Sequence, residues 1–256
     1  MKVILPSLNA FPIKSVELSV PTFGAFRAVQ MYNVEPLLRK VKLVTLCSSV
    51  NLSKISWDDL EYLYDLLAFT VLNNNASFKV TCPQGHTFNH KVQLSSCDIV
   101  QLSNQGKKPK AIFFVGLRPY KFRLLSAQDV LDSFEFAQSQ EDEEFAFLCA
   151  KRNLALGKSL DSEFSQSLPM SLGLSVDLYQ KLNYHGIKKQ CQVTCPECGE
   201  VFNLKWDLGV TPFDISLEKL MDYYASVSDR ITFSDFMSMS IREFNAMVNT
   251  INKMMR

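Results

Sequence analysis

Two short segments of this chain, more than a hundred residues apart, each place two metal-ligating side chains around a tight turn. Residues 80–86 read Val-Thr-Cys-Pro-Gln-Gly-His, and residues 193–199 read Val-Thr-Cys-Pro-Glu-Cys-Gly. After the turn the first segment continues Phe-Asn-His-Lys at 88–91, and the second continues Phe-Asn-Leu-Lys at 202–205. Because the likeness extends beyond the ligands, we interpret the two segments as copies of one β-hairpin.

Together the two turns offer Cys82, His86, Cys195 and Cys198, a set of sulfur and nitrogen donors that suits tetrahedral zinc. The Cys195-x-x-Cys198 pair, followed by Gly199, has the spacing of a zinc-ribbon knuckle, in which the glycine permits a left-handed residue. The first turn has one residue more between its ligands, which the longer imidazole side chain accommodates. Because two ligands alone hold zinc weakly, the sequence predicts that the hairpins touch and share one structural zinc ion.

Other roles for these residues were weighed against the zinc site. A redox pair is the alternative for Cys195 and Cys198, but no thioredoxin-like strand-helix-strand pattern surrounds them. Cys191 and His90 each stand four residues from a predicted ligand and remain alternative ligands, although strand alternation turns some of these side chains off the turn. His185 adjoins a helix end, where we expect a surface position. A catalytic zinc keeps an open coordination position, whereas this set is closed.

The rest of the sequence predicts the elements that must position the two turns. Alternating β-favouring residues indicate a short N-terminal hairpin within residues 2–20, and helical spacing runs from residue 22 to about residue 75. Two strands are expected at 111–115 and 120–124, joined by a turn near Pro119. Further short helices are expected at 160–168 and 176–184.

Two serine-to-aspartate spacings mark helix starts. Ser56 precedes Asp59 by three residues, and Ser126 precedes Asp129 by three, so each pair fits a capping box at a helix N-terminus. The Asn triplet at 73–75 ends the first of these helices, because asparagine tolerates left-handed geometry.

The chain beyond Pro212 is helical again and ends in an apolar stripe that serves either core packing or docking on a partner. Its members are Phe244, Met247, Val248, Ile251 and Met255. The predicted fold class is α+β and mainly helical, with a split zinc-ribbon-like module of two β-hairpins and helical segments before, between and after them. The expected divisions are residues 1–125, a helical insertion at 126–187, and residues 188–256, joined by the zinc into one compact unit.

Composition sets limits on the class of protein. The 256 residues include 27 basic and 26 acidic ones and are 47% hydrophobic, so a globular core is expected and non-specific binding to nucleic acid or anionic membranes is not. No run of eighteen apolar residues and no signal peptide is present, which favours a soluble intracellular protein. Cys47, Cys97 and Cys149 are expected as buried thiols. No phosphate-binding loop or hydrolase motif occurs.

Charged clusters are local. Lysines at 107, 108 and 110, with Arg118, Lys121 and Arg123, form the only basic concentration, which we assign to an exposed loop and the solvent side of a strand. The acidic run at 141–144 is assigned to a solvated helix start. A zinc-ribbon module that binds nucleic acid is the alternative function that the basic concentration supports.

Several motifs resemble the base plate proteins of T-even-like bacteriophages. They are the Leu-Pro start, a Val-Glu-Leu-x-Val-Pro-Thr-Phe segment leading into a helix, an acidic helix before a Cys-Pro turn, and a late Cys-Pro-x-Cys-Gly. The stretch at 233–244 is similar to the ends of such chains. His86 departs from a doubled Cys-x-x-Cys pattern, so the resemblance does not carry over an identical metal geometry.

The resemblance implies a baseplate hub subunit, or a factor that helps to assemble the hub of a contractile tail, without enzymatic activity. Expected partners are other phage tail and baseplate proteins, with no small-molecule substrate, no nucleic acid and no membrane insertion. The expected location is the host cytoplasm during assembly and then the tail baseplate of the virion.

Overall fold

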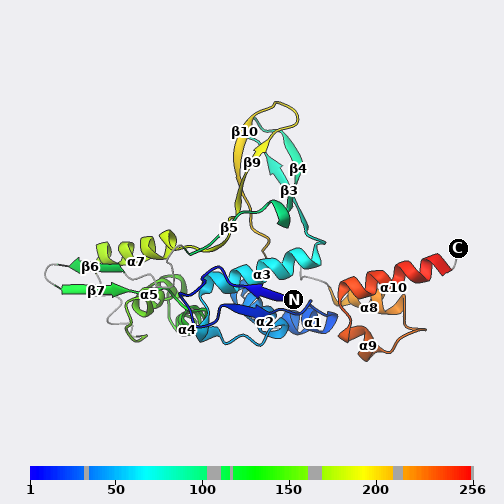
Figure 1. Ribbon diagram of the computed structural model, residues 1–256, viewed down its shortest axis with the longest axis horizontal. Helices are drawn as coiled ribbons and strands as arrows, with labels where there is room; N and C mark the ends of the chain where they lie inside the picture. Colours follow the sequence, from blue (N-terminus) through cyan, green and yellow to red (C-terminus); the bar gives the residue numbers. More distant parts are fainter. Residues whose placement is uncertain (32–34, 103–110, 116–117, 161–168, 210–215, 255–256) are drawn as a thin grey trace.

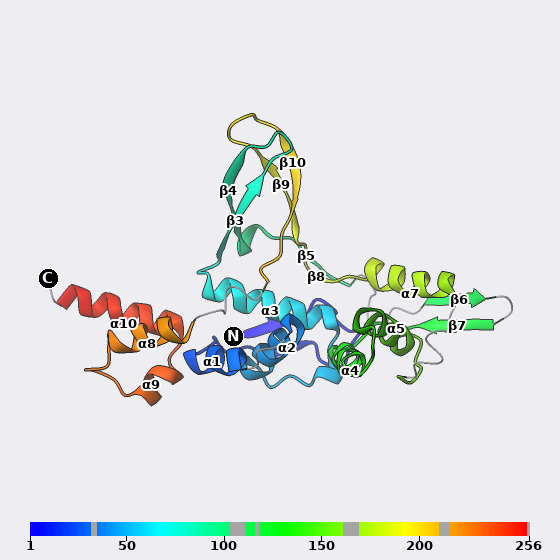
Figure 2. The ribbon, with the colours of Figure 1, turned by 180° about the vertical axis from the view of Figure 1, so that it is seen from behind.

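A helical base carries an upright pair of β-hairpins (Figures 1 and 2). The computed structural model describes residues 1–31, 35–102, 111–115, 118–160, 169–209 and 216–254. The described residues are mainly helical, with short antiparallel two-stranded sheets, so the α+β prediction is confirmed.

The N-terminal part forms the centre of the base. Strands β1 (Lys2–Ile4) and β2 (Ser15–Glu17) pair antiparallel, as the sequence predicts. Three α-helices follow, namely α1 (Phe23–Met31), α2 (Pro36–Cys47) and α3 (Trp57–Val71), with a short 3-10 turn, η1 (Leu52–Lys54), before the last. Almost the whole of α3 is buried, because the N-terminal hairpin, the other helices and the base of the upright hairpins all pack around it.

Both predicted capping boxes are present. The Oγ of Ser56 accepts a hydrogen bond from the N–H of Asp59 at 2.9 Å, and the Oγ of Ser126 accepts one from Asp129 at 3.1 Å. After α3, Asn73 and Asn74 take positive φ angles of 52° and 63°, which supports the predicted helix end.

The two capped helix starts meet. The N–H of Trp57 donates to the carbonyl of Leu125, and the N–H of Ala127 donates to the carbonyl of Ile55, each at 3.1 Å. This reciprocal pair joins the start of α3 to the start of α4 (Ala127–Ala137). The inserted segment is therefore anchored to the central helix by backbone hydrogen bonds as well as by side-chain packing.

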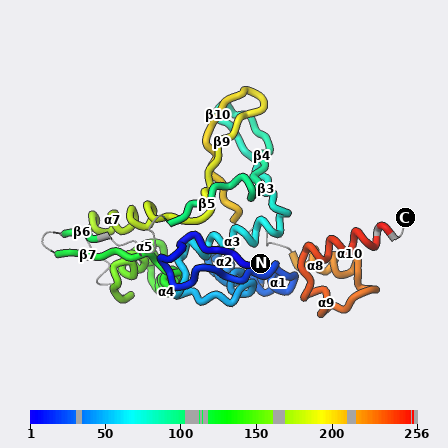
Figure 3. Tube along the Cα trace, viewed as in Figure 1, coloured from blue at the N-terminus to red at the C-terminus, as the bar shows by residue number. Residues whose placement is uncertain are grey.

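The upright part consists of two hairpins that lie face to face (Figures 1 and 3). Strands β3 (Asn75–Thr81) and β4 (Thr87–Gln93) form the first, and β9 (Gln190–Thr194) and β10 (Val201–Lys205) form the second. We call these four strands and their turns the ribbon. After β4 comes a 3-10 turn, η2 (Leu94–Ser96). At the foot, β5 (Ile99–Val100) pairs with β8 (Gly186–Ile187), which brings together the two ends of the segment between the hairpins.

That segment forms one end of the base. It contains strands β6 (Ala111–Val115) and β7 (Arg118–Phe122), and helices α4, α5 (Glu143–Ala155) and α7 (Met170–Leu182). The second strand begins at Arg118 and not at residue 120 as predicted, so Pro119, near which the turn was expected, lies inside β7 opposite Phe114. The acidic run is an exposed helix start as predicted, since Asp142 caps α5. The helix predicted at 160–168, apart from residue 160, and Lys107, Lys108 and Lys110 lie outside the described residues.

The C-terminal helices dock on α1 through aromatic rings. They are α8 (Leu217–Ala225), α9 (Phe233–Ser238) and α10 (Ile241–Met254). Phe23 of α1 stacks on Phe236 with ring centroids 4.5 Å apart and meets Phe244 edge to face at 5.6 Å. Met247, Val248 and Ile251 pack half-buried against the same core, which agrees with core packing of the predicted stripe. Met255 lies outside the described residues.

Buried side chains form two clusters. The larger unites the N-terminal hairpin, α1 to α3, the foot of the ribbon and the C-terminal helices, and the smaller fills the inserted segment. Cys47 and Cys149 are buried free thiols as expected, whereas Cys97 is only half-buried. Among the described helices, none combines the length and the hydropathy needed to cross a membrane.

Candidate metal centre

The first ligand turn closes with two backbone hydrogen bonds. The N–H of Gly85 donates to the carbonyl of Cys82, and the N–H of Cys82 donates to the carbonyl of His86, both at 2.9 Å. Gly85 has a φ of +91°, a conformation that side chains with a Cβ rarely adopt. The turn thus directs the Cys82 and His86 side chains toward the second hairpin.

The second turn closes with a corresponding pair of backbone hydrogen bonds, although it is one residue longer. The N–H of Gly199 donates to the carbonyl of Cys195, and the N–H of Cys195 donates to the carbonyl of Glu200, both at 2.9 Å. Gly199 has a φ of +73°, as the sequence motif requires. The likeness of the two segments in sequence is therefore a likeness in backbone geometry as well.

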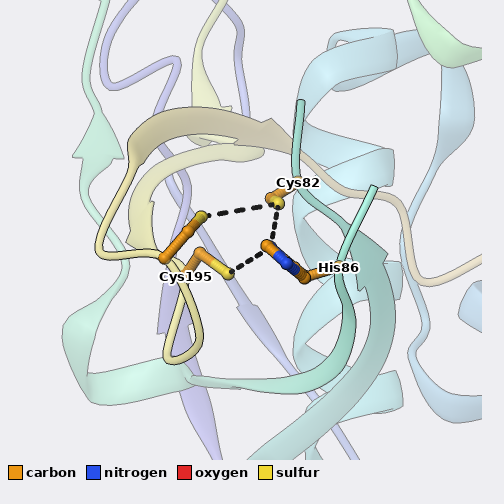
Figure 4. Close-up of side chains that lie close together, drawn as sticks. Cys82, His86 and Cys195 are labelled. Atoms are coloured by element: carbon orange, nitrogen blue, oxygen red, sulfur yellow. Dashed lines mark hydrogen bonds between the residues drawn. The ribbon is translucent and has the colours of Figure 1, made fainter. Parts of the chain in front are cut away.

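The structure brings all four predicted ligands together at the far end of the ribbon (Figure 4). The ligand atoms of Cys82, His86, Cys195 and Cys198 all lie within 4.8 Å of one another. The Cys82 Sγ lies 3.6 Å from the Nδ1 of His86 and 3.9 Å from the Sγ of Cys198. The Cys195 Sγ is 3.9 Å from the same nitrogen.

These separations fit a single ion at the centre of the cluster. A tetrahedral zinc about 2.3 Å from each sulfur and about 2.0 Å from the nitrogen would hold its ligand atoms about 3.5 to 3.8 Å apart. The three separations given above lie within a few tenths of an ångström of that range. The cluster can therefore hold a metal ion after only small movements of the side chains.

The two nitrogens of the His86 imidazole have different neighbours. Its Nδ1 faces the cysteine sulfurs, while its Nε2 lies 3.8 Å from the Oε2 of Glu197. A carboxylate beside the outer nitrogen of a metal-binding histidine favours the tautomer in which that nitrogen carries the proton and the inner one binds the metal. Sequence reasoning did not assign Glu197 a role, although its place between Cys195 and Cys198 was the available signal.

The local electrostatics differ between the two cysteines of the second turn. Burial alone would raise the pKa of Cys195, but hydrogen bonds from the backbone N–H groups of Cys198 and Glu197 lower it to about 7. The N–H of Glu200 acts to lower the pKa of Cys198, but burial and the neighbouring Cys195 and Cys82 together raise it. Of these two thiols, Cys195 is therefore the one that more readily forms the thiolate that metal binding requires.

Few apolar side chains surround the four-ligand cluster. Cys82 and Cys195 are buried, His86 is half-buried and Cys198 is exposed, so an ion would be reached from the side of Cys198. Just below the turns, Val80 and Val193 are buried, and the rings of Phe88 and Phe202 meet edge to face at 6.5 Å. These few side chains separate the cluster from the foot of the ribbon.

The alternative ligands form a separate pair. The Sγ of Cys191 lies 3.9 Å from the Nε2 of His90, and neither belongs to the cluster of four. Each stands four residues along its strand from a cluster member, which is the same face of the strand but farther from the turns. Neither residue replaces a predicted ligand in this arrangement.

The surface position expected for His185 was wrong. This side chain is fully buried, and its Nε2 lies 2.6 Å from the Oγ of Ser56 at the start of α3. The sequence neighbourhood of His185, next to a helix end and a glycine, resembles an exposed helix terminus. The burial depends on α3, which lies more than a hundred residues away in the sequence.

Comparisons with protein-family models, with curated proteins and with solved structures find no match for this chain.

Proposed function

We propose that this protein is a non-enzymatic structural or assembly component of the baseplate hub of a contractile phage tail, stabilised by a structural zinc ion. The observation that carries the proposal is the four-donor cluster, which joins two hairpins distant in the sequence. Four protein ligands complete a tetrahedron and leave no position for a substrate or a catalytic water. The tail assignment itself rests on the motifs shared with base plate proteins.

Zinc is the metal that best suits three sulfurs and one imidazole nitrogen. Zinc is a borderline-soft ion without redox chemistry, and sites with three cysteines and one histidine are among its usual structural sites. Metal analysis of protein purified without added metal should find about one zinc per chain. Another metal at that stoichiometry, or no metal, would contradict this part of the proposal.

A role in assembly is supported by an exposed apolar stripe on α7. Met170, Leu174, Leu178 and Leu182 follow one another at four-residue steps, and their exposed fractions are 80%, 55%, 55% and 75%. A row of this kind on one helix face is typical of a surface that contacts another protein. On this proposal, α7 docks on a neighbouring tail protein.

The proposal is tested by the composition of tails and their precursors. We expect the protein to co-purify at a fixed stoichiometry with other baseplate chains, either in finished tails or in hub intermediates. A Leu174→Glu, Leu178→Glu double variant should be lost from these complexes, while Ser171→Glu, an exposed change on the same helix, should be retained. Absence of the wild-type protein from tails and intermediates alike would overturn the assignment.

A zinc ribbon that binds nucleic acid is the second candidate. The outward positions of the four ribbon strands carry hydroxyl, amide and lysine side chains with one valine and no carboxylate, including Lys79, Lys91 and Lys205. Such a surface suits phosphate contacts, which weaken as salt rises. Binding of single- or double-stranded DNA or RNA that weakens from 50 to about 200 mM salt would favour this candidate. Undetectable binding at low salt would remove it.

A further inference from the structure

A cavity of about 220 Å³ lies where the inserted segment meets the central helices of the base. Its walls come from α2, the start of α3, α4, α5, the end of α7 and the residues around it. Most of the lining is apolar, namely Leu37, Trp57, Leu124, Leu125, Val130 and Phe147. The volume is smaller than the pockets that hold drug-sized molecules, so any ligand must be small.

The histidine and the serine in the wall already have their hydrogen-bond partners. The Oγ of Ser56 accepts from the N–H of Asp59 at 2.9 Å, and the Nδ1 of His185 lies 2.9 Å from the carbonyl of Asn183. Because a carbonyl only accepts, Nδ1 carries a proton. In the neutral ring the Nε2 then accepts the hydroxyl proton of Ser56, at 2.6 Å. Neither side chain has a polar atom to spare for a ligand.

Gln180 is occupied as well. Its amide nitrogen donates to the carbonyl of Arg123 at 2.8 Å, and its amide oxygen accepts from the N–H of Leu125 at 3.3 Å. The polar side chains in the wall that retain unused hydrogen-bonding capacity are Asp58 and Lys151.

Asp58 and Lys151 carry opposite charges but do not pair with each other. The Oδ2 of Asp58 accepts from the N–H of His185 at 3.2 Å, whereas its Oδ1 receives no hydrogen bond from the described residues. The Nζ of Lys151 lies over the ring of Phe147, 4.7 Å from its centroid, and has no carboxylate within 4.0 Å among the described residues. The cavity thus offers one unsatisfied acceptor and one unsatisfied cation.

Both groups are partly withdrawn from water, with the Asp58 side chain 24% exposed and Lys151 half-buried. Burial raises the pKa of Asp58 to about 6, against the opposing effect of the nearby His185. Burial also lowers the pKa of Lys151. A partner of opposite charge at each group would restore the interactions that burial removes, since a buried charge is stable only when it is paired.

We propose that this cavity binds a small zwitterion with an apolar side chain, of the class of the aliphatic or aromatic α-amino acids. The ammonium group would donate to Asp58, the carboxylate would accept from Lys151, and the side chain would pack against Trp57 and the surrounding apolar wall. This ligand site is independent of the metal centre and goes beyond the proposed tail function.

Calorimetry and thermal-shift measurements on the zinc-loaded full-length chain test the site, with L-leucine and L-phenylalanine as probes. We expect saturable binding of at least one of the two at one ligand per chain, with a rise in the melting temperature. Isoamylamine, which lacks the carboxylate, and isocaproate, which lacks the ammonium group, should each bind at least about tenfold more weakly, because each loses one charge-assisted contact.

Substitutions of Lys151 and Asp58 test whether these two residues bind the ligand. Lys151→Met and Asp58→Asn should each weaken L-leucine binding at least about tenfold, while Lys158→Met, an exposed lysine outside the cavity wall, should leave it unchanged. The comparison of leucine with its two single-charge analogues needs no variant, so it stands even where Asp58→Asn disturbs the start of α3. Absence of binding up to about 10 mM, or equal binding of leucine and isocaproate, would overturn the proposal.

Discussion

The upper ribbon and the helical base are stabilised by different means. In the base, Leu60, Leu63 and Leu67 of α3 are fully buried within a cluster that also unites the N-terminal hairpin and the C-terminal helices. By the upper ribbon we mean the two ligand turns and the strand ends next to them. The buried apolar side chains of the strands there are Val80 and Val193, neither of which belongs to the two main clusters. A two-stranded hairpin is at best marginally stable alone, so a metal ion held by the cluster would supply there the stability that a hydrophobic core supplies below.

The foot of the ribbon, where its strands meet α3, is stabilised by contacts with the base. Trp206, which follows β10, meets Phe69 of α3 edge to face at 6.0 Å and lies 5.9 Å from Phe78 of β3. The ammonium of Lys189 lies 3.1 Å from Asp65 of α3. Loss of the metal should therefore open the upper ribbon and leave its foot in place.

The largest effect is expected from removing a metal ligand. Cys195→Ser should reduce the bound zinc from about one per chain to near zero and abolish hydrogen-exchange protection in the upper ribbon, because a structural zinc site contributes directly to folding. Protection of α3 should persist. Cys191→Ser, a change four residues away on the same strand, is the matched control and should retain the metal. Equal zinc content in the two variants would contradict the four-ligand cluster.

A core substitution in the base should lower the stability of the base and leave the metal in the ribbon. Leu63→Ala removes a fully buried side chain from α3 and should lower the free energy of unfolding by about 2 to 5 kcal/mol. Denaturant titration followed by circular dichroism measures this loss. Zinc content of the folded variant should stay at wild-type level. A variant that loses its zinc while still folded would show that the two regions are less separate than we infer.

The next largest loss of stability is expected at the junction between ribbon and base, where Lys189 pairs with Asp65. Lys189→Met leaves the 1%-exposed Asp65 without its nearest cation, whereas the lysine side chain itself is 20% exposed. We expect a loss of about 1 to 3 kcal/mol, below that for a fully buried pair because water screens the lysine. Lys188→Met, whose lysine is 53% exposed beside Asp98, should change stability by less than about 1 kcal/mol.

Acid should act on the two regions in opposite directions. Burial raises the pKa of Asp65 to about 6, although Lys189 opposes this, so the folded protein takes up a proton more readily than the unfolded chain. The contribution of this carboxyl is therefore fully present below its unfolded pKa and is lost as the pH rises through about 6. Between pH 7 and pH 5 the base should gain stability from Asp65 while the ribbon loses metal, because the ligands must be deprotonated.

Two measurements separate these opposing effects of pH. Metal release is followed with a chromogenic chelator, and the stability of the base is followed by denaturant titration of metal-free protein at each pH. Asp65→Asn should make the second profile less steep, with a remaining slope from Asp58, whose pKa is also raised to about 6, and should leave the first profile unchanged. A metal-free base that loses stability steadily from pH 7 to pH 5 would disagree with the direction of the Asp65 shift.

The smallest effect concerns the backbone of the second turn. Gly199→Ala places a Cβ at a φ of +73°, where nothing lies within 4 Å, so the cost is conformational strain of about 1 to 2 kcal/mol without a steric clash. Zinc affinity should fall by about tenfold, and the melting of the base should not change. Competition with a chelator of known affinity measures the first, and calorimetry the second.

The sequence predicted much of the local structure and all four members of the cluster. Capping at Ser56 and Ser126 and the glycine turns at Gly85 and Gly199 are decided within a few residues, so the pattern of side chains is sufficient to identify them. The start of β7 was predicted two residues too late, because among the described residues β7 pairs with β6 alone, and such a strand tolerates a proline, which lacks an N–H donor.

Spacing could also suggest that the two hairpins meet, because each turn supplies only half of a tetrahedral set. The sequence left Cys191 and His90 as alternatives to Cys195 and His86, since in each strand two candidate residues project from the same face, and only the structure excludes them. The geometry places Cys195 and His86 in the cluster and pairs the other two below it.

Donor types, turn geometry and helix starts follow from short-range chemistry and could therefore be read from the chain alone. The burial of His185 against Ser56 and the presence of Asp58 and Lys151 in the wall of one cavity depend on how α3, α5 and α7 pack. These arrangements bring together residues from about ninety to more than a hundred positions apart, and no local pattern encodes them. They exist because burying apolar surface brings these helices together, and the polar side chains are positioned by that packing.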